Sequence, residues 1–340
     1  MKSFRGQIYS FFLLILSLFV FNSCGPSNSL NIDVSEIDVN LEVKRFEKDL
    51  IALDSPLNSK AINSLIDQYP EFYPIYMQRI MGFGSVEDSS YFKILSDFLT
   101  NEDINTLFED TDSVFADFNP AKAELEKAFK HVKYYYPEYE VPAITTFISG
   151  FQYQVIMLEN SMALGLDLFL GANYQYYGTT NLPQYIIRKL IPEQITTKVI
   201  TSLVADMYPE RTVDNFAQRM IVEGKRMCFL DAMLPETHDT LKMGYTLLQL
   251  EWASKNEEQI WRYLIDKELL YGNANLDFAK YFEEAPFTNS IGTDSSPKLG
   301  IYIGWQIVRK YMSENPSLTL DELMKETDYQ KILKKSGYRP

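Results

Sequence analysis

Apolar residues recur at two different spacings along this chain, and each spacing predicts a different kind of element. Between residues 32 and 46 they occupy every second position, at Ile37, Val39, Leu41 and Val43. That alternation predicts a strand with one buried face. Residues 142–150, 152–158 and 162–170 are apolar, β-branched or alternating, so we expect three further strands there.

Elsewhere the apolar residues mostly follow the helical spacing. Residues 59–130 are expected to form helices joined by short turns, and Asn119-Pro120 is a typical helix start because Asn caps helices and Pro fits the first turn. Further helices are expected at 193–208, 213–233, 247–270 and 300–312, and behind a capping box at 319–322. The sequence therefore predicts an α+β fold that is mostly helical, with a small antiparallel or mixed sheet.

The first residues are typical of an exported protein. Lys2 and Arg5 precede a mostly apolar run of 11 residues at 11–21, which is shorter than the roughly 20 residues of a membrane-spanning helix. Because the run ends just before Cys24, we expect a lipoprotein signal peptide at 1–23 and lipidation of Cys24. A tether at 24–31 would then lead into a single domain at 32–340. An ordinary signal peptide with a chance cysteine is the alternative.

The charge of the chain excludes one class of partner. The 340 residues include 32 basic and 46 acidic side chains, giving a net charge of −14, whereas nucleic-acid binding needs a basic surface. Anionic lipid headgroups would repel such an acidic body. We therefore expect the membrane to be bound only through the acylated Cys24.

Few residues could support metal or nucleophilic chemistry. The two histidines, His131 and His238, are too far apart for an HExxH zinc motif, and we expect them to be solvated or to cap helices. The two cysteines, Cys24 and Cys228, exclude a disulfide framework, and Cys228 is expected to be a buried apolar residue. No dinucleotide fingerprint, phosphate-binding loop or GxSxG motif occurs in the sequence, so we expect neither a metal nor a cofactor.

Asp167 lies within an otherwise apolar predicted strand, where an unpaired carboxylate would be costly. We expect a structural role for it, with an Arg of a neighbouring helix as its partner. A catalytic pair of Asp167 and Glu223 is an alternative, because two carboxylates can act as general acid and general base.

A polar, aromatic loop at 173–181 contains three tyrosines: Tyr174, Tyr176 and Tyr177. Exposed tyrosines favour interfaces because they bury a large area at low entropic cost. The loop and Trp305 together are a candidate surface for a partner or ligand, beside a helix whose Gly300 and Gly304 would let a neighbour approach closely. The alternative is that the tyrosines fold back over the core as a lid.

Long stretches of the sequence resemble the gliding-motility lipoprotein GldB family. They lie at 223–225, 229–235, 249–252, 259–261, 269–271, 285–288, 296–300, 303–309 and 330–336. The resemblance implies a lipid-anchored cell-envelope protein of the Bacteroidota that is required for gliding and linked to type IX secretion. It also implies protein partners in that machinery, and we expect the periplasmic side of the membrane.

The order of elements in the second half of the chain is similar to that of gluzincin metallopeptidases. In those enzymes one helix carries HExxH and the next supplies a Glu as third zinc ligand. Placing Glu223 at the third position puts HExxH at 200–204, which includes Ser202 and offers no good zinc ligand. We therefore expect a degenerate, vestigial site and no enzymatic activity.

Other interpretations of these residues stay open. The favoured alternative for Glu223 is an ordinary helix carboxylate paired with Lys225 or Arg226. The chain as a whole is also compatible with an active hydrolase whose site is not recognised, or with a lipid-anchored protein that binds peptides or glycans through the aromatic loop.

Overall fold

The computed structural model describes residues 32–53, 56–209, 213–272 and 276–340. Val34–Pro340 forms one compact unit. The predicted signal peptide at 1–23, Cys24 and the tether at 24–31 lie outside the described residues. Within the described ranges, no helix combines the length and the apolar character needed to cross a membrane.

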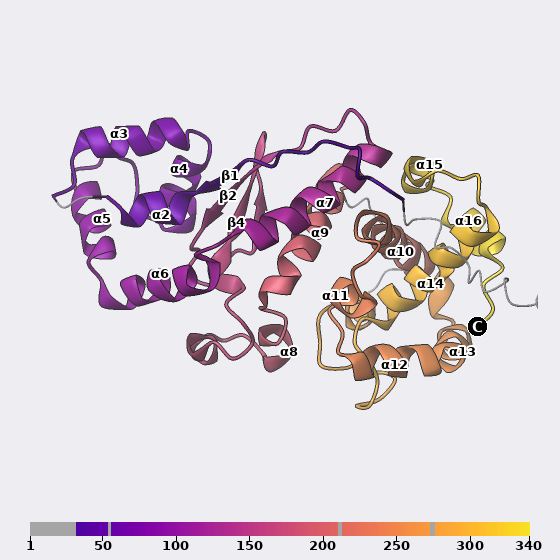
Figure 1. Cartoon of the computed structure of the whole chain (residues 1–340). Coiled ribbons are helices and arrows are strands. Elements are labelled where there is room, and N and C mark those ends of the chain that lie inside the picture. The colour runs from indigo at the N-terminus through magenta and orange to yellow at the C-terminus, as the bar shows by residue number, and fades with distance from the viewer. Residues whose placement is uncertain (1–31, 54–55, 210–212, 273–275) are drawn as a thin grey trace, which may run out of the picture. The chain divides into compact units, whose positions relative to one another are not determined.

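Four short strands form one mixed sheet (Figure 1): β1 (Val43–Arg45), β2 (Ala143–Phe147), β3 (Val155–Met157) and β4 (Ser161–Gly165). Their order is β1-β2-β4-β3. β2 pairs in parallel with both β1 and β4, whereas β3 runs antiparallel to β4 at the edge. The predicted α+β class, mostly helical with a small mixed sheet, is confirmed.

All four strands are shorter than the sequence predicts, and the reasons are clear for β1 and β4. Only 43–45 of the predicted strand at 32–46 pairs with β2, and the amide of Leu41 donates to the Glu126 side chain instead of a strand. β4 ends at Gly165, where a β-carbon would lie 2.0 Å from the Tyr153 carbonyl oxygen. The chain then turns into the short 3-10 helix η3 (Leu166–Leu168), because Asp167 bonds to a neighbouring loop rather than to a partner strand.

A group of helices from the first part of the chain packs beside the sheet (Figure 1). It comprises α2 (Phe46–Ile51), α3 (Ser59–Gln68), α4 (Phe72–Pro74), the π-helix η2 (Ile75–Ile80), α5 (Tyr91–Leu99) and α6 (Glu102–Phe115). The ring of Phe46 meets those of Tyr69, Phe72 and Tyr76 at centroid distances of 4.8–5.1 Å. Phe147 of β2 joins the same core, so burial of aromatic rings ties these helices to the sheet.

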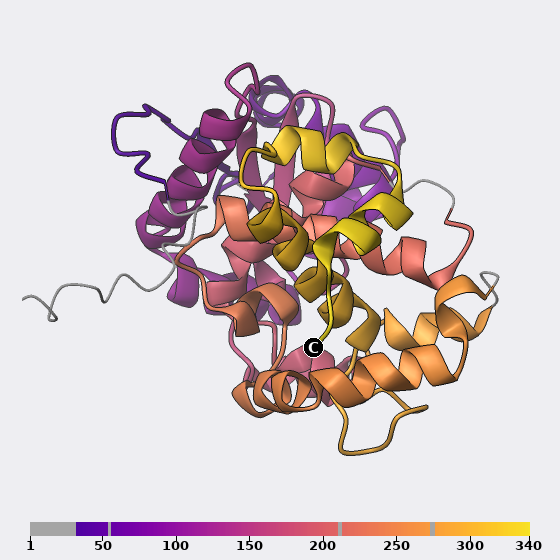
Figure 2. The ribbon, with the colours of Figure 1, turned by 90° about the vertical axis from the view of Figure 1, so that its right-hand side faces the viewer.

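The remaining helices lie on the other side of the sheet (Figures 1 and 2). They are α7 (Asn119–Tyr135), α8 (Gln184–Ile187), α9 (Ile195–Met207), α10 (Phe216–Met233), α11 (Asp239–Met243), α12 (Leu247–Lys255), α13 (Glu257–Asp266), α14 (Leu299–Glu314), α15 (Leu320–Lys325) and α16 (Tyr329–Ser336), with 3-10 helices η5 (Pro192–Gln194), η6 (Leu269–Tyr271) and η7 (Leu276–Tyr281). The 3-10 helix η4 (Gln175–Thr179) follows Tyr174, which bonds to Asp110 of α6. The helix start near Asn119-Pro120 and the Thr319–Glu322 capping box are confirmed, although Asn119 is the first helical residue rather than the cap.

The predicted single helix at 247–270 is wrong. It is divided into α12 and α13 at Asn256, whose side chain donates to the Trp252 carbonyl and so ends the first helix. Asn256 is polar and has a low helix propensity. A prediction based on the spacing of apolar residues takes no account of it.

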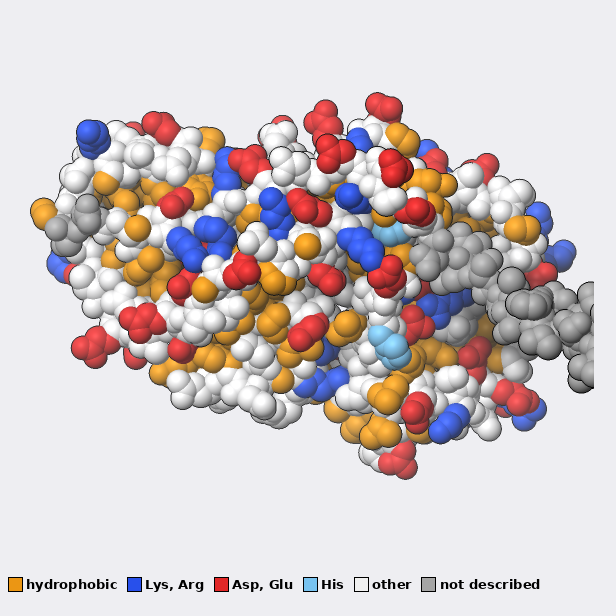
Figure 3. All heavy atoms as spheres, in the orientation of Figure 1, with side chains coloured by type: hydrophobic (Ala, Val, Ile, Leu, Met, Phe, Trp, Pro, Cys, Tyr) orange, Lys and Arg blue, Asp and Glu red, His pale blue; other side chains and the backbone are white. Residues whose placement is uncertain are grey.

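Gly300 and Gly304 both allow a neighbour to approach α14 closely, as predicted, but the neighbours differ: Gly300 lies against Phe282 and the Tyr281 carbonyl, and Gly304 lies against α10. A β-carbon at Gly304 would lie 2.0 Å from the Met220 carbonyl oxygen, and one at Gly224 would lie 2.2 Å from the Gly304 carbonyl oxygen. The two backbones are therefore in direct contact. At the surface, acidic and basic side chains are interspersed over the face shown in Figure 3.

Candidate functional site

α9 and α10 form opposite walls of a partly open cavity of about 190 Å³. α10 contributes Glu223 and Arg226, and α9 contributes Thr197, Lys198 and Thr201. The chain also supplies residues from the turn after α8, from α11 and from the start of α14. Glu223, predicted from sequence as the remnant of a site, thus lies in the wall of a real cavity.

Glu223 is held by its own helix. Its Oε1 lies 3.0 Å from Nη2 of Arg219 and 3.3 Å from Nη1 of Arg226. Of the two partners proposed from sequence, Arg226 is therefore present and Lys225 is not, because Lys225 donates instead to the carbonyls of Met324 and Glu326.

The segment of α9 that faces this cavity begins about one turn earlier than expected. Thr197 and Thr201 both line it and are separated by the same four-residue step as the two histidines of HExxH, whereas Ser202 does not line it. Neither Thr is a good zinc ligand, and Lys198 stands where the motif has its catalytic Glu. Within the described residues, no group of three His, Cys, Asp or Glu side chains is placed to hold a metal.

A carboxylate on the far side of the cavity pairs with two lysines. Oε2 of Glu284 lies 2.7 Å from Nζ of Lys189, and its Oε1 lies 2.9 Å from Nζ of Lys298. Burial, then the nearby Lys298, lowers the pKa of Lys189 to about 8. Burial would raise the pKa of Glu284, but the two lysines together hold it at about 2. Glu284 is therefore charged at neutral pH and shared between two cations.

Lys198 of α9 is another lysine of this cavity. Among the described residues it has no hydrogen bond and no ion pair. Burial, followed by repulsion from Lys298, lowers its pKa. Sequence reasoning missed Lys189, Lys198 and Glu284, because nothing in their local spacing shows that they meet.

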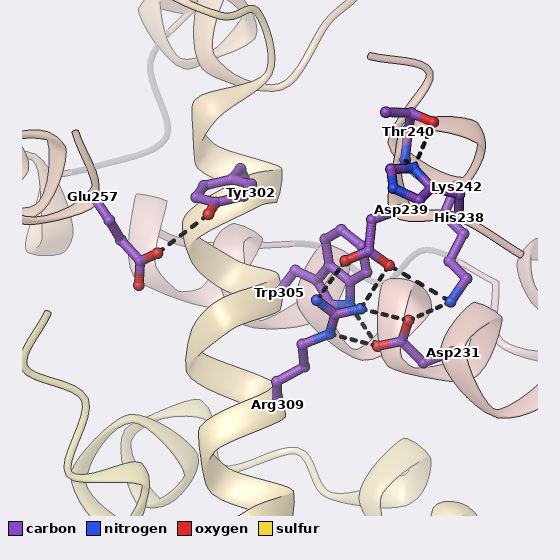
Figure 4. Close-up of polar contacts among 9 residues, drawn as sticks. All are labelled: Asp231, His238, Asp239, Thr240, Lys242, Glu257, Tyr302, Trp305 and Arg309. Carbon is purple, nitrogen blue, oxygen red and sulfur yellow. Dashed lines mark hydrogen bonds and ion pairs between the residues drawn. The ribbon is translucent and has the colours of Figure 1, made fainter. Parts of the chain in front are cut away.

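A charged network underlies the cavity and joins α10, α11 and α14 (Figure 4). Asp231 accepts from Nε1 of Trp305 at 2.8 Å, from Nε of Arg309 at 2.7 Å and from Nζ of Lys242 at 2.9 Å. Arg309 also contacts Asp239 through two bonds of 2.9 and 3.0 Å. Lys242 belongs both to this network and to the cavity wall, so the network fixes the position of that wall.

The same network places Trp305 in the interior. Its side chain is fully buried, and the guanidinium of Arg309 lies 3.6 Å from the ring centroid. Trp305 is thus a structural residue between helices, and it is not part of the exposed surface for which it was a candidate.

The aromatic loop is only partly exposed. Tyr177 is fully buried, accepts from the Leu170 amide and donates to the Asp167 carbonyl. Tyr174 is half-buried and donates to Asp110 at 2.9 Å, whereas Tyr176 is 36% exposed. Tyr174 and Tyr177 therefore fold back over the core, as in the alternative prediction of a lid. Of these three tyrosines, only Tyr176 is exposed.

Asp167 is held by hydrogen bonds from a loop, and the prediction that it pairs with an Arg is wrong. Its carboxylate accepts from the amides of Ser149 and Phe151 at 2.8 and 2.6 Å and from the Ser149 hydroxyl. Full burial raises its pKa to about 6, against the opposite effect of these hydrogen bonds. Glu223 pairs with Arg219 and Arg226 instead, and the cavity that it lines does not include Asp167, so the structure does not bring the two carboxylates into one site.

The two histidines line one larger cavity of about 480 Å³ between α7, α9 and α11. His238 caps α11, as expected, because its Nδ1 accepts from the Thr240 amide at 3.2 Å. His131 is not solvated: it is 2% exposed, and its Nδ1 has no partner among the described residues. Burial, then the nearby Lys127, lowers its pKa, although Glu236 acts in the opposite direction.

This burial of His131 predicts a pH-dependent stability. Because its pKa is lower in the folded chain, the unfolded chain takes up the proton first, and stability is lost as the pH falls below about 6.5. We expect His131→Leu to reduce the loss of unfolding free energy between pH 7 and pH 5, measured by urea unfolding. The raised pKa of Asp167 changes the stability in the opposite direction over this pH range. Asp167 is present in both proteins, so its effect cancels when the variant is compared with wild type. An identical pH dependence in the two proteins would contradict the prediction.

Comparison with known proteins gives one match. The sequence model of a family described as gliding motility protein GldB matches residues 27–340. No curated protein and no solved structure matches the chain. The match covers every described residue, including the cavity and the Asp231 network, and the chain therefore belongs to the GldB family of gliding motility lipoproteins.

Proposed function

We propose that this protein is a lipid-anchored component of the cell envelope that acts by binding protein partners of the gliding machinery and not by hydrolysing peptides. The family match over residues 27–340 carries this proposal. We further propose that the same machinery links it to type IX secretion, and that it faces the periplasm.

The residues of the cavity support a non-catalytic role. A metallopeptidase needs about three donors around zinc and a carboxylate that activates water. The α9 side chains in the wall with Glu223 are hydroxyls, an ammonium and apolar groups, and both Glu223 and Glu284 are already paired with cations. If the fold descends from a gluzincin, the positions of the zinc ligands and of the general base now hold residues that cannot bind zinc or activate water.

The proposed anchor is tested by Cys24→Ala. Cells that carry this variant in place of the native gene are expected to stop spreading on a surface, because we expect the acidic body to hold the membrane only through Cys24. The measurement is colony spreading together with fractionation of the envelope. A Cys24→Ala protein that is still found in the membrane, with normal spreading, would remove the anchor from the proposal.

The non-catalytic role is tested separately by Glu223→Gln, which keeps the shape of the side chain. We expect normal spreading from a folded, membrane-bound variant. Loss of spreading, with normal protein levels and a normal circular dichroism spectrum, would instead favour the hydrolase interpretation. Stoichiometric zinc in the purified protein would do so as well.

A further inference from the structure

The cavity beside Glu223 concentrates positive charge in an acidic protein. Among the described residues, its lining side chains include five basic and two acidic ones: Lys189, Lys198, Arg226, Lys242 and Lys298 against Glu223 and Glu284. The chain as a whole carries a net charge of −14. A concave site of one sign within a surface of the other attracts ligands of opposite charge.

The two acidic side chains do not neutralise this wall. Glu223 is engaged by Arg219 and Arg226, and Glu284 is shared by Lys189 and Lys298. Lys242 forms an ion pair with Asp231, which does not line the cavity. Lys198 makes no hydrogen bond or ion pair among the described residues. Glu284 attracts it, but that carboxylate is already shared by Lys189 and Lys298, and Lys298 repels Lys198.

Space for a ligand is kept open at Gly244. Its backbone is left-handed, with φ +66°, and a β-carbon there would lie 3.0 Å from Cδ of Lys189 and 3.7 Å from Nζ of Lys298. A side chain at this position would be strained and would press on Lys189. Gly244 therefore lets the two ammonium groups reach the cavity.

One part of the wall is apolar, formed by Met227 and Leu230 of α10, Val204 of α9 and Ile301 of α14. At about 190 Å³ the cavity exceeds the roughly 150 Å³ that holds a benzene ring in a protein interior. A charged group and a ring-sized apolar group can thus be accommodated together.

We propose that this cavity binds an organic anion, whose carboxylate or phosphate group is held by Lys198 with Lys189 and Lys298, and whose apolar part lies against Met227 and Leu230. Ammonium groups recognise both kinds of oxyanion as point charges. An anion beside Lys198 would supply a contacting partner of opposite charge, which Glu284 is not because it already pairs with Lys189 and Lys298, and it would stabilise the protonated form of Lys198.

The test uses the full chain in a non-ionic detergent, with phenyl phosphate, benzoate and the neutral benzamide as probes. Lysine acetylation at pH 8 is followed by mass spectrometry, residue by residue. We expect phenyl phosphate or benzoate to protect Lys198 and Lys189 but not Lys255, which is 76% exposed on α12. The anion that protects better identifies the class of the natural group.

A variant pair makes the test specific. Lys198→Met removes the charge but keeps an unbranched side chain, and we expect it to weaken binding of the protecting anion about tenfold or more by calorimetry. Lys255→Met is the matched control and should bind like wild type. Glu223→Gln should also bind, which separates this proposal from the test of catalysis above. Protection by neither anion, equal protection by benzamide, or unchanged binding to Lys198→Met would overturn the proposal.

Discussion

Asp231→Asn is expected to destabilise the folded chain by about 3 kcal/mol, because it removes one member of a buried, charged network. Asp231 is 4% exposed and accepts from Trp305, Arg309 and Lys242. An Asn can still accept from the indole, but it leaves the 4%-exposed side chain of Lys242 with only Asp239 at 3.7 Å. The measurement is the free energy of unfolding in urea.

The charge on Arg309 accounts for much of that expected loss. Burial alone would lower the pKa of Arg309, but its hydrogen bonds to Asp231 and Asp239 raise that pKa above the usual value. The cation is therefore stabilised by two carboxylates from two other helices. Removing one carboxylate weakens the connection of α14 to both α10 and α11 (Figure 4).

A surface pair provides the control. Asp97→Asn breaks an ion pair with Lys93 on α5 whose two side chains are 65% and 78% exposed, and we expect a much smaller loss of stability than for Asp231→Asn. If the two variants differ from wild type by the same small amount, the Asp231 network does not stabilise the fold.

The elements that sequence predicted well are those specified by local chemistry. The capping box of Thr319 and Glu322 satisfies amides within four residues of each other, so its geometry is contained in the sequence that shows it. The helix at 300–312 has a continuous apolar face and no internal breaker, and it appears as α14. The division of the predicted helix at 247–270 depends on one side-chain bond of Asn256, which periodicity does not reveal.

The candidate site was predictable only in part, because its neighbours come from distant segments. Glu223 could be singled out from the order of elements, but the α9 residues that face its cavity begin at Thr197, one turn before the expected segment. Glu284 meets Lys189 across 95 positions, and no pattern in one sequence shows such a contact. Burial of the Asp167 carboxylate requires hydrogen-bond partners, as the sequence predicts. Those partners are backbone amides of a loop, and the identity of the loop's side chains does not show where its amides point.

The contact between α10 and α14 predicts that Gly304→Ala lowers the stability of the folded chain, although replacing Gly by Ala within a helix usually raises it. Gly304→Ala in the middle of a helix normally stabilises it by about 1 kcal/mol. Here the added β-carbon would lie 2.0 Å from the carbonyl oxygen of Met220 and 2.7 Å from its carbonyl carbon. Because the obstacle is backbone, the helices must move apart, and we expect a net loss of about 3 kcal/mol.

Urea unfolding of Gly304→Ala beside Gly178→Ala measures this effect against a matched control. A β-carbon added at Gly178 would have no atom within 4 Å, and this residue lies outside the helix pair, so its substitution should change stability by less than about 1 kcal/mol. Separation of α10 from α14 should also disturb the bonds of Asp231 to Trp305 and Arg309, which cross the same interface. Gly304→Ala and Asp231→Asn should consequently be less than additive in the double variant. A stabilised Gly304→Ala protein would show that the two helices are not in backbone contact.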